Sequence, residues 1–371
     1  MTTTFNFIVN KSNLAETELE TVELPNLQQG EVLFEINRFA LTSNNVTYGV
    51  AGDMLGYWKF FPCKEGWGRI PVWGIAKVKS SKCEDIVNDT LYYGYFPMSE
   101  HLIVSPTKIG KHGFSDAAEC RQSLSPVYNQ YSLVTEQNGF HPSQYNHQII
   151  YRPLFTTSFI LDDLMMDHDY FGADQIILSS ASSKTAFGTA FQLSNSDKKV
   201  IGLTSESNRE FVNSLGIYDQ VISYEEIESL DKNLKTVYID MSGNRAVLGT
   251  VHHHFEDNLV NSCGVGITHW DALDGEDPKS LPGARPTMFF APTQIQKRSS
   301  EWGPEALQAK LALAWNKFVS FVDNHVQLEE SKAPETIGDI YKIMIEGPSP
   351  NKGYALLSAN EMSTNEITRE S

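Results

Sequence analysis

The pattern of apolar and polar positions is most regular in the middle of the chain. Residues 175–178 form a short, β-branched apolar run, and the small residues 179–183 follow it. Phe187 and Phe191 then recur at the spacing of one helix face. Residues 198–205 hold a second apolar run. The pattern predicts a strand, a tight turn, a helix and a second strand, which together make a βαβ unit.

The same alternation of short apolar runs and amphipathic stretches continues to residue 325, whereas residues 1–150 have the pattern of a β-rich domain. Residues 116–148 show little periodicity, and we expect an extended loop or arm there. The order of elements predicts the α/β fold class, with a doubly wound parallel sheet inside a β-rich chain. Further strands are expected at 31–40, as a β pair at 91–104, and at 235–241, 259–268, 287–291 and 353–357; further helices are expected from 152, at 245–255 and at 304–325.

Length and charge narrow the class of protein. A chain of 371 residues is too long for one ordinary core, so we expect two domains. The formal net charge of −17 repels polyanions and argues against nucleic acid and anionic membranes as partners. We expect no signal peptide and no membrane span, because no apolar run approaches the ~20 residues that a spanning helix needs. The four cysteines lack CxxC spacing, which favours reduced thiols and a cytoplasmic location.

The turn after the first strand of the βαβ unit is a candidate phosphate site. A helix N-terminus offers unpaired N–H groups and the positive end of a dipole. Ser182, Ser183 and Thr185 add hydroxyl donors there, and Lys184 adds a positive charge. Serine and alanine replace the glycines of both the dinucleotide fingerprint and the nucleotide triphosphate loop. The alternative is an ordinary strand-to-helix turn with a serine cap.

The end of the second strand bears on the choice of cofactor. In a dinucleotide fold this position holds the adenosine ribose, and an acidic residue there selects NAD. Thr204 and Ser205 occupy the position here, and Arg209 follows one helical turn later. Small hydroxyls and cations suit a 2′-phosphate, so the sequence favours NADP(H). The alternative for Arg209 is a solvated position on the helix.

The stretches 29–36, 88–95 and 200–205 resemble motifs of the medium-chain dehydrogenase/reductase superfamily. The resemblance implies a GroES-like β-rich domain over residues 1–150, a Rossmann dinucleotide-binding domain over 151–290, and a C-terminal return over 291–371 that completes the β-rich domain. Finer features resemble a branch of the superfamily defined only as a domain of unknown function. The motifs of the branch lie at 152–159, 182–186, 266–271 and 289–294.

The zinc ligands of the alcohol dehydrogenases in this superfamily have no counterpart here. The corresponding stretches, 41–48 and 73–76, contain no metal-binding side chain, and no cluster of four cysteines is present. His252, His253 and His254 with Asp257 are the remaining metal candidates, but adjacent residues on a helix point about 100° apart. A polar or partly buried helix face is the favoured interpretation, and we expect no zinc.

Zinc-independent quinone and enoyl reductases of the superfamily polarise their substrates by hydrogen bonds. By this resemblance Tyr48 is the candidate donor, and Asn45 is a candidate for orienting a substrate carbonyl. Tyr57 is an alternative donor, and a packing role for Tyr48 is the competing interpretation. His269, at the end of the predicted strand 259–268, is a candidate general acid or nicotinamide contact, or else a buried structural histidine. Thr268 and Phe290 are candidate cofactor contacts.

The sequence therefore favours an NADP(H)-dependent, zinc-independent oxidoreductase. Its expected substrate is a carbonyl or conjugated alkene of a small, largely apolar molecule, because aromatic side chains are expected to line the cleft. The alternatives are a redox-silent dinucleotide-binding protein and a scaffold that binds no nucleotide. The superfamily resemblance also implies a homo-oligomer, for which the stretch 259–267 is a candidate pairing edge. The aromatic residues expected in the cleft are Tyr48, Trp58, Tyr95 and Phe290.

Overall fold

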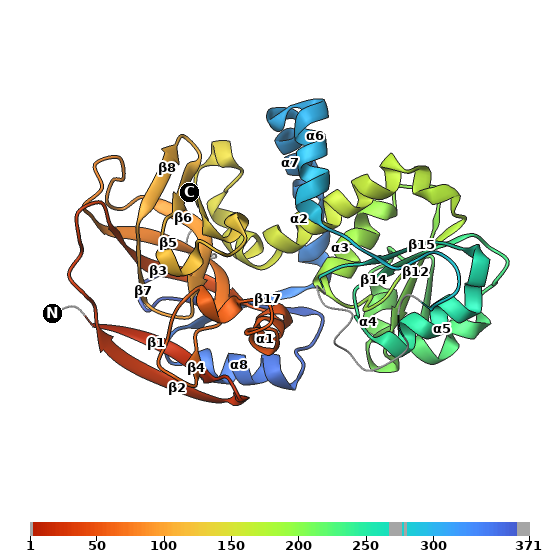
Figure 1. Cartoon of the computed structure of the whole chain (residues 1–371), viewed down its shortest axis with the longest axis horizontal. Helices are drawn as coiled ribbons and strands as arrows, with labels where there is room; N and C mark the ends of the chain where they lie inside the picture. The colour runs from red at the N-terminus through yellow and green to blue at the C-terminus, as the bar shows by residue number, and fades with distance from the viewer. Residues whose placement is uncertain (1–2, 267–276, 278–279, 362–371) are drawn as a thin grey trace. The chain divides into compact units, whose positions relative to one another are not determined.

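A computed structural model describes residues 3–266, 277 and 280–361 of the chain. Contacts between residues divide the chain into two compact units (Figure 1). The first unit comprises residues 1–150 and 327–371, and the second comprises residues 151–326. Residues 291–326, which the sequence placed in the C-terminal return, group with the second unit instead. The two helices in that segment pack on a long helix of the second unit, which gives the physical reason.

The first unit is β-rich. Among the described residues, β1 (Thr3–Asn10), β2 (Asn13–Glu23) and β4 (Trp67–Gly68) form an antiparallel sheet in the order β2-β1-β4. A larger sheet has the order β17-β18-β3-β5-β6-β10-β9-β8, with β7 also paired to β3. Its strands are β3 (Val32–Leu41), β5 (Pro71–Ser81), β6 (Leu91–Pro97), β7 (His101–Val104), β8 (Pro106–Gly110), β9 (Gly113–Asp116), β10 (Gln130–Leu133), β17 (Gln327–Lys332) and β18 (Lys352–Leu357), and the helices of this unit are α1 (Ser43–Val50) and α8 (Ile337–Glu346).

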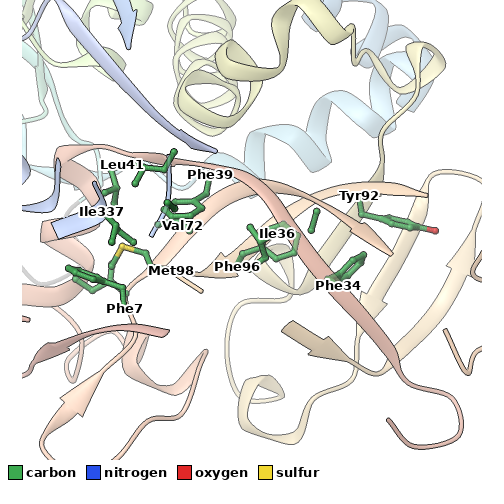
Figure 2. Packing of buried hydrophobic residues seen from close by; sticks show 14 of the residues in the cluster. Phe7, Phe34, Ile36, Phe39, Leu41, Val72, Tyr92, Phe96, Met98 and Ile337 are labelled. Atoms are coloured by element: carbon green, nitrogen blue, oxygen red, sulfur yellow. The ribbon is translucent and has the colours of Figure 1, made fainter. Parts of the chain in front are cut away.

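Alternation of inward and outward side chains explains how β3 builds the core of this unit. Phe34 and Ile36 point inward and are almost fully buried. The ring of Phe34 meets those of Tyr92 and Phe96 edge to face at 5.7 and 5.8 Å. Figure 2 shows these side chains in one apolar layer, which also receives Ile337 from α8.

Two details of the predicted β-rich domain are wrong. The strands at 91–104 do not pair with each other, because β6 pairs with β5 and β10 while β7 pairs with β3. The segment 116–148 is not a free arm, because it contains β10 and also the first residues of a long helix. β17 and α8 have no counterpart among the predicted elements.

The second unit is a parallel sheet with helices on both faces. Within the described residues its strands have the order β13-β12-β11-β14-β15-β16, all parallel. They are β11 (Gln175–Leu178), β12 (Lys199–Thr204), β13 (Gln220–Ser223), β14 (Thr236–Asp240), β15 (Leu259–Gly264) and β16 (Thr287–Met288). The helices are α2 (Tyr145–Asp167), α3 (Lys184–Leu193), α4 (Arg209–Ser214), α5 (Arg245–Phe255), α6 (Ala291–Trp302) and α7 (Pro304–His325).

Side chains of β11 explain the two covered faces. Ile176 and Leu178 pack with residues of α2 and α3, whereas Ile177 packs with residues of α5 on the opposite face (Figure 1). A central strand that is buried on both sides reads as a continuous apolar run, which is the pattern of residues 175–178. The predicted doubly wound α/β architecture is therefore confirmed.

The predictions for the end of the second unit hold only in part. β15 ends at Gly264, and residues 267 and 268 of the predicted strand lie outside the described residues. The predicted strand 287–291 shrinks to β16, because α6 begins at Ala291. β16 pairs with β15, so among the described residues β15 is not an edge strand and the stretch 259–267 is not a free pairing edge.

Candidate functional site

The carboxyl end of β11 is fixed by a buried serine. The hydroxyl of Ser179 donates to Oδ1 of Asp240 at 2.7 Å and accepts from the N–H groups of Met241 and Ser242 at 2.8 and 3.0 Å. Both Ser179 and Asp240 are buried. These bonds join the ends of β11 and β14, so the turn that follows β11 starts from a rigid point.

The turn between β11 and α3 lies against β12. The N–H of Ala181 donates to the carbonyl of Leu203 at 2.9 Å, and the hydroxyl of Tyr218 donates to the carbonyl of Ala181 at 2.9 Å. Gly202 makes this approach possible, because a Cβ at that position would lie 3.0 Å from the Cβ of Ala181. Ser180 has a φ of 48°, which is rare for a residue with a side chain. Both backbone polar groups of Ala181 are therefore hydrogen-bonded, the N–H to β12 and the carbonyl to Tyr218.

Four predicted residues come together at the start of α3. Ser183 is the N-cap, and its hydroxyl accepts from the N–H of Ala186 at 3.3 Å. The hydroxyl of Ser182 accepts from the side-chain amide of Asn208 at 3.1 Å. Lys184 and Thr185 are the first two residues of the helix. Amide groups, hydroxyls and a cation at a helix N-terminus suit a phosphate.

Lys184 is half-buried, and burial lowers its pKa to about 8. Loss of solvent disfavours the ammonium form, so a fraction of the side chain is neutral at mildly alkaline pH. A bound anion would favour the ammonium form. The charge of Lys184 is therefore sensitive both to pH and to what binds at the helix.

The end of β12 differs from the sequence-based expectation. Thr204 is buried, whereas the hydroxyls of Ser205 and Ser207 lie 3.0 Å apart near the surface. Arg209 is partly exposed and is paired with two carboxylates: its Nη1 lies 3.2 Å from Oε2 of Glu206 and 3.0 Å from Oε2 of Glu226.

Neither of these carboxylates was predicted. Glu206 lies two residues after β12, close enough to the strand end for the sequence alone to indicate it. Glu226 follows β13 in a short 3₁₀ helix, and no local signal connects it with Arg209. Only the pairing of β12 with β13 brings the two side chains together.

Three further predicted cofactor or catalytic residues follow β15. Thr268 and His269 lie outside the described residues. Phe290 is the N-cap of α6, two residues after the end of β16, and 65% of it is exposed. It lies at the carboxyl end of the parallel sheet, where open α/β folds bind ligands.

The predicted proton donor lies in a cluster of aromatic residues in the first unit. The ring of Tyr48, on α1, stacks on that of Tyr57 with centroids 4.5 Å apart. It meets the ring of Tyr95 edge to face at 6.1 Å. The hydroxyl of Tyr95 is buried and close to Tyr48, but their geometry is not that of a hydrogen bond, and no other described residue satisfies it. The remaining members of this tyrosine cluster are Phe60, Phe61, Trp73, Leu102, Leu124 and Tyr128.

Three tyrosines of this cluster, Tyr48, Tyr57 and Tyr95, keep their phenolic protons at neutral pH. Burial, with a smaller effect of the neighbouring Tyr128, raises the pKa of Tyr48 well above its ordinary value. Burial likewise raises the pKa of Tyr57 and of Tyr95. A phenol with a raised pKa keeps its proton at neutral pH, so it donates a hydrogen bond and does not act as a base.

Two residues predicted near the substrate, Asn45 and Trp58, make contacts that stabilise the fold. The amide oxygen of Asn45 accepts from the N–H of Thr42 at 2.7 Å, and its nitrogen donates to the carbonyl of Pro71 at 2.8 Å. Asn45 therefore fixes the start of α1. Trp58 is buried in the main apolar core, where it lies directly over Gly52 and Gly68, and not in the tyrosine cluster. Small residues at those two positions leave space for the indole.

A buried ion pair supports the tyrosine cluster. Nη1 of Arg121 lies 2.9 Å from Oδ2 of Asp116, and both side chains are almost fully buried. Nε of Arg121 donates to the carbonyl of Phe60 at 3.1 Å, and Nη1 donates to the hydroxyl of Tyr131 at 3.0 Å. That hydroxyl donates to the carbonyl of Tyr95 at 2.9 Å. The pair thus holds two members of the cluster, a relationship that sequence spacing did not indicate.

Two of the three histidines on α5, His252 and His254, have non-metal partners. His252 is buried, with Nδ1 2.8 Å from the carbonyl oxygen of Pro282 and Nε2 2.9 Å from Oγ of Ser262. Nε2 of His254 lies 2.9 Å from the carbonyl oxygen of Leu230. Across the part of the chain that the structure describes, no group of three or more His, Cys, Asp or Glu side chains is arranged to hold a metal ion. No helix in the same residues has the length and apolar character needed to cross a membrane.

Several solved structures share this fold over nearly the whole chain. CurA from Vibrio vulnificus in complex with NADPH superposes with a TM-score of 0.61 at 13% identity. TarJ from S. aureus in complex with NADPH gives 0.57 at 9% identity, and the quinone oxidoreductase from Coxiella burnetii gives 0.54 at 12% identity. Each comparison covers 96% of this chain and 99% of the other. This chain therefore shares the fold of these proteins, as the sequence-based resemblance implied.

A family model matches most of the chain. Residues 39–349 match the model of a family described as "Protein of unknown function (DUF2855)". The match spans most of the chain, so the protein belongs to this family, and the resemblance to a branch of unknown function is confirmed. No curated protein sequence matches the chain.

Proposed function

We propose that the protein is an NADP(H)-dependent oxidoreductase that reduces a carbonyl or conjugated alkene of a small, largely apolar molecule. The observation that carries this proposal is the turn between β11 and α3. Its backbone is fixed by β12 and β14, and it presents Ser182, Lys184 and Thr185 at a helix N-terminus. The NADPH complexes of the similarly folded CurA and TarJ support the same choice of cofactor.

The residues of the second unit fit such a cofactor chemically. The N-terminus of α3 and the side chains of Ser182, Lys184 and Thr185 would hold the pyrophosphate. Ser205 and Arg209 would contact the 2′-phosphate, since a guanidinium suits its geometry. Bound NADPH supplies a hydride from its nicotinamide ring. Cofactor roles for Ser183, Thr204, Thr268 and Phe290, and a catalytic role for His269, remain predictions.

The tyrosine cluster supplies the hydrogen-bond donor of the proposed reaction. Tyr48 keeps its phenolic proton at neutral pH and would donate to the substrate oxygen that gains negative charge. Tyr57, stacked on it, is the alternative donor. Aromatic rings around the donor favour a substrate that is mostly apolar. Asn45 is left out of this mechanism, because the backbone of Thr42 and Pro71 engages its amide.

The proposed reaction does not use zinc. The stretches 41–48 and 73–76 contain no side chain that commonly binds zinc. We expect less than one zinc per ten chains by elemental analysis of untagged protein, with activity unchanged after dialysis against a chelator. One zinc per chain, or activity that returns only when zinc is added, would overturn this part of the proposal.

Cofactor binding is the first test, and it requires no substrate. We expect NADPH to quench the intrinsic fluorescence in a saturable titration. Lys184→Met should weaken NADPH binding ~10–100-fold, the range for loss of a hydrogen bond to a charged group. Lys199→Met is the matched control, because Lys199 lies at the amino end of β12 and its ammonium donates to Gln220. Absence of NADPH binding to the unaltered protein would overturn the proposal.

A redox-silent dinucleotide-binding protein is the second candidate, because the tyrosine donor need not imply turnover. Oxidation of NADPH in the presence of a panel of carbonyls and enones separates the two. Saturable NADPH binding with no turnover of any acceptor would favour the redox-silent protein.

A further inference from the structure

Arg209 is held by two carboxylates of different character. Glu206 begins the short 3₁₀ helix 206–208 directly after Ser205, and its side chain is 73% exposed. Glu226 comes from the neighbouring 3₁₀ helix 224–229, and its side chain is 41% exposed. Both carboxylates approach the same nitrogen, Nη1 of Arg209.

Glu226 is anchored to the backbone as well as to the arginine. Its Oε2 accepts from the N–H of Ser223 at 2.9 Å, as the second half of a capping box. That hydrogen bond, followed by the charge of Arg209, lowers the pKa of Glu226. The second terminal nitrogen of the guanidinium, Nη2, lies 3.5 Å from the carbonyl oxygen of Val221. Arg209 is therefore fixed on the side of β13.

Glu206 contacts Arg209 from the end of β12, whereas Glu226 contacts it from the segment after β13. The Glu206 carboxylate directly follows Ser205 at the end of β12, where a dinucleotide fold places the adenosine ribose. A carboxylate in this region accepts hydrogen bonds from a free ribose hydroxyl, as in proteins that select NAD. A 2′-phosphate, by contrast, carries the same sign of charge as Glu206 and needs the same guanidinium.

We propose that Glu206 sets the cofactor preference of the site by competing with the 2′-phosphate for Arg209. NADPH binds by displacing Glu206 from the guanidinium, while Glu226 keeps Arg209 in place. NADH leaves the Glu206–Arg209 pair intact and gains a hydrogen bond to Glu206. The inference rests on the proposed NADP(H) function, and it names the residue that limits discrimination between the two cofactors.

Dissociation constants for NADPH and NADH, measured by calorimetry, test this inference without any substrate. Glu206→Gln removes the competing charge but keeps the size of the side chain. We expect it to shift the NADPH-to-NADH affinity ratio about tenfold toward NADPH, on the scale of one charged hydrogen bond. Glu210→Gln is the matched control, because Glu210 is an exposed carboxylate in the first turn of α4. It should change the ratio less than twofold.

A double-mutant cycle shows whether the effect acts through Arg209. In the Arg209→Ala background, Glu206→Gln should shift the affinity ratio by clearly less than in the unaltered protein, because only the direct effects of Glu206 on the cofactor remain. The same tenfold shift in that background would overturn the inference, as would a ratio in Glu206→Gln equal to that of Glu210→Gln. Either result leaves the proposed function standing if NADPH still binds. Failure of the unaltered protein to bind either cofactor would overturn both.

Discussion

Gly188 on α3 lies so close to Ser158 on α2 that a Cβ at position 188 would lie 2.8 Å from Oγ of Ser158. That hydroxyl donates to the carbonyl of Thr185 at 2.9 Å and to that of Leu154 at 3.1 Å. Ser158 thus ties the first turn of α3 to α2. The close approach of the two helices depends on the missing side chain at Gly188.

Gly188→Ala should lower the stability of the second unit by about 1–3 kcal/mol, because the added methyl group forces α3 away from α2. Gly249→Ala is the control, since Gly249 lies within α5 and a Cβ there meets no atom within 4 Å. It should raise stability by about 0.5–1 kcal/mol through the better helix propensity of alanine. Thermal unfolding measures both changes. An unchanged or higher midpoint for Gly188→Ala would contradict the prediction.

Helices with a clear cap or a regular apolar spacing were predicted correctly from the sequence. The helix 245–255 has its predicted bounds because Asn244 caps it, accepting from two backbone N–H groups, and its apolar residues recur at helical spacing. The helix 304–325 likewise begins at Pro304, as predicted. α6 was missed because its buried side chains include Gln294 and Arg298, which give no apolar periodicity.

Features that the sequence did not predict depend on polar contacts between residues far apart in the chain. Arg298 is buried because Asp163 on α2 lies 2.7 Å from its Nε, a pairing that joins positions far apart in the chain. In the candidate site, too, contacts between neighbouring residues were predictable and contacts between distant residues were not. The turn before α3 was predicted because its residues are adjacent, whereas the partner Glu226 of Arg209 depends on strand order. Asn45 was assigned to the substrate by resemblance and by its place near Tyr48, whereas its bonds to Thr42 and Pro71 depend on the folded structure.

The affinity for NADPH should fall as pH rises above about 8. The pKa of Lys184 in the folded protein is about 8, so its positive charge is present below that pH and is lost above it. Loss of the charge removes an attraction to phosphate, and the dissociation constant should rise up to about tenfold between pH 7 and 9. Lys184→Met should show no such rise. Equal affinities of the unaltered protein at pH 7 and 9 would contradict the assignment.

The proposed homo-oligomer should form through the edge of the parallel sheet. Among the described residues β16 is the last strand on that side, and Met288 on it is 39% exposed. An open edge pairs readily with a second chain, and the superfamily resemblance implies such dimers. Light scattering at micromolar concentration should give at least twice the chain mass. Met288→Asp should shift the protein toward monomer, whereas Leu313→Asp, at a 65% exposed position on α7, should not. A monomeric unaltered protein would end this proposal.

The donor role of Tyr48 makes the most specific prediction about rate. If Tyr48 donates to the oxygen that gains charge, Tyr48→Phe should lower kcat by ~10²–10³, the loss for one oxyanion donor. NADPH affinity should stay nearly unchanged, because Tyr48 belongs to the first unit and the proposed phosphate contacts to the second.

Tyr341→Phe is the matched control for Tyr48→Phe. The Tyr341 hydroxyl is buried and has no hydrogen-bond partner among the described residues, and its ring packs on Phe7 with centroids 5.3 Å apart. Its removal should leave kcat unchanged and should not lower stability, because an unsatisfied buried polar group is lost. The comparison requires an acceptor that is turned over, so the panel assay comes first. Full kcat in Tyr48→Phe would assign the donor role to Tyr57 instead. The ring of Tyr57 stacks on that of Tyr48, and burial also raises the pKa of Tyr57.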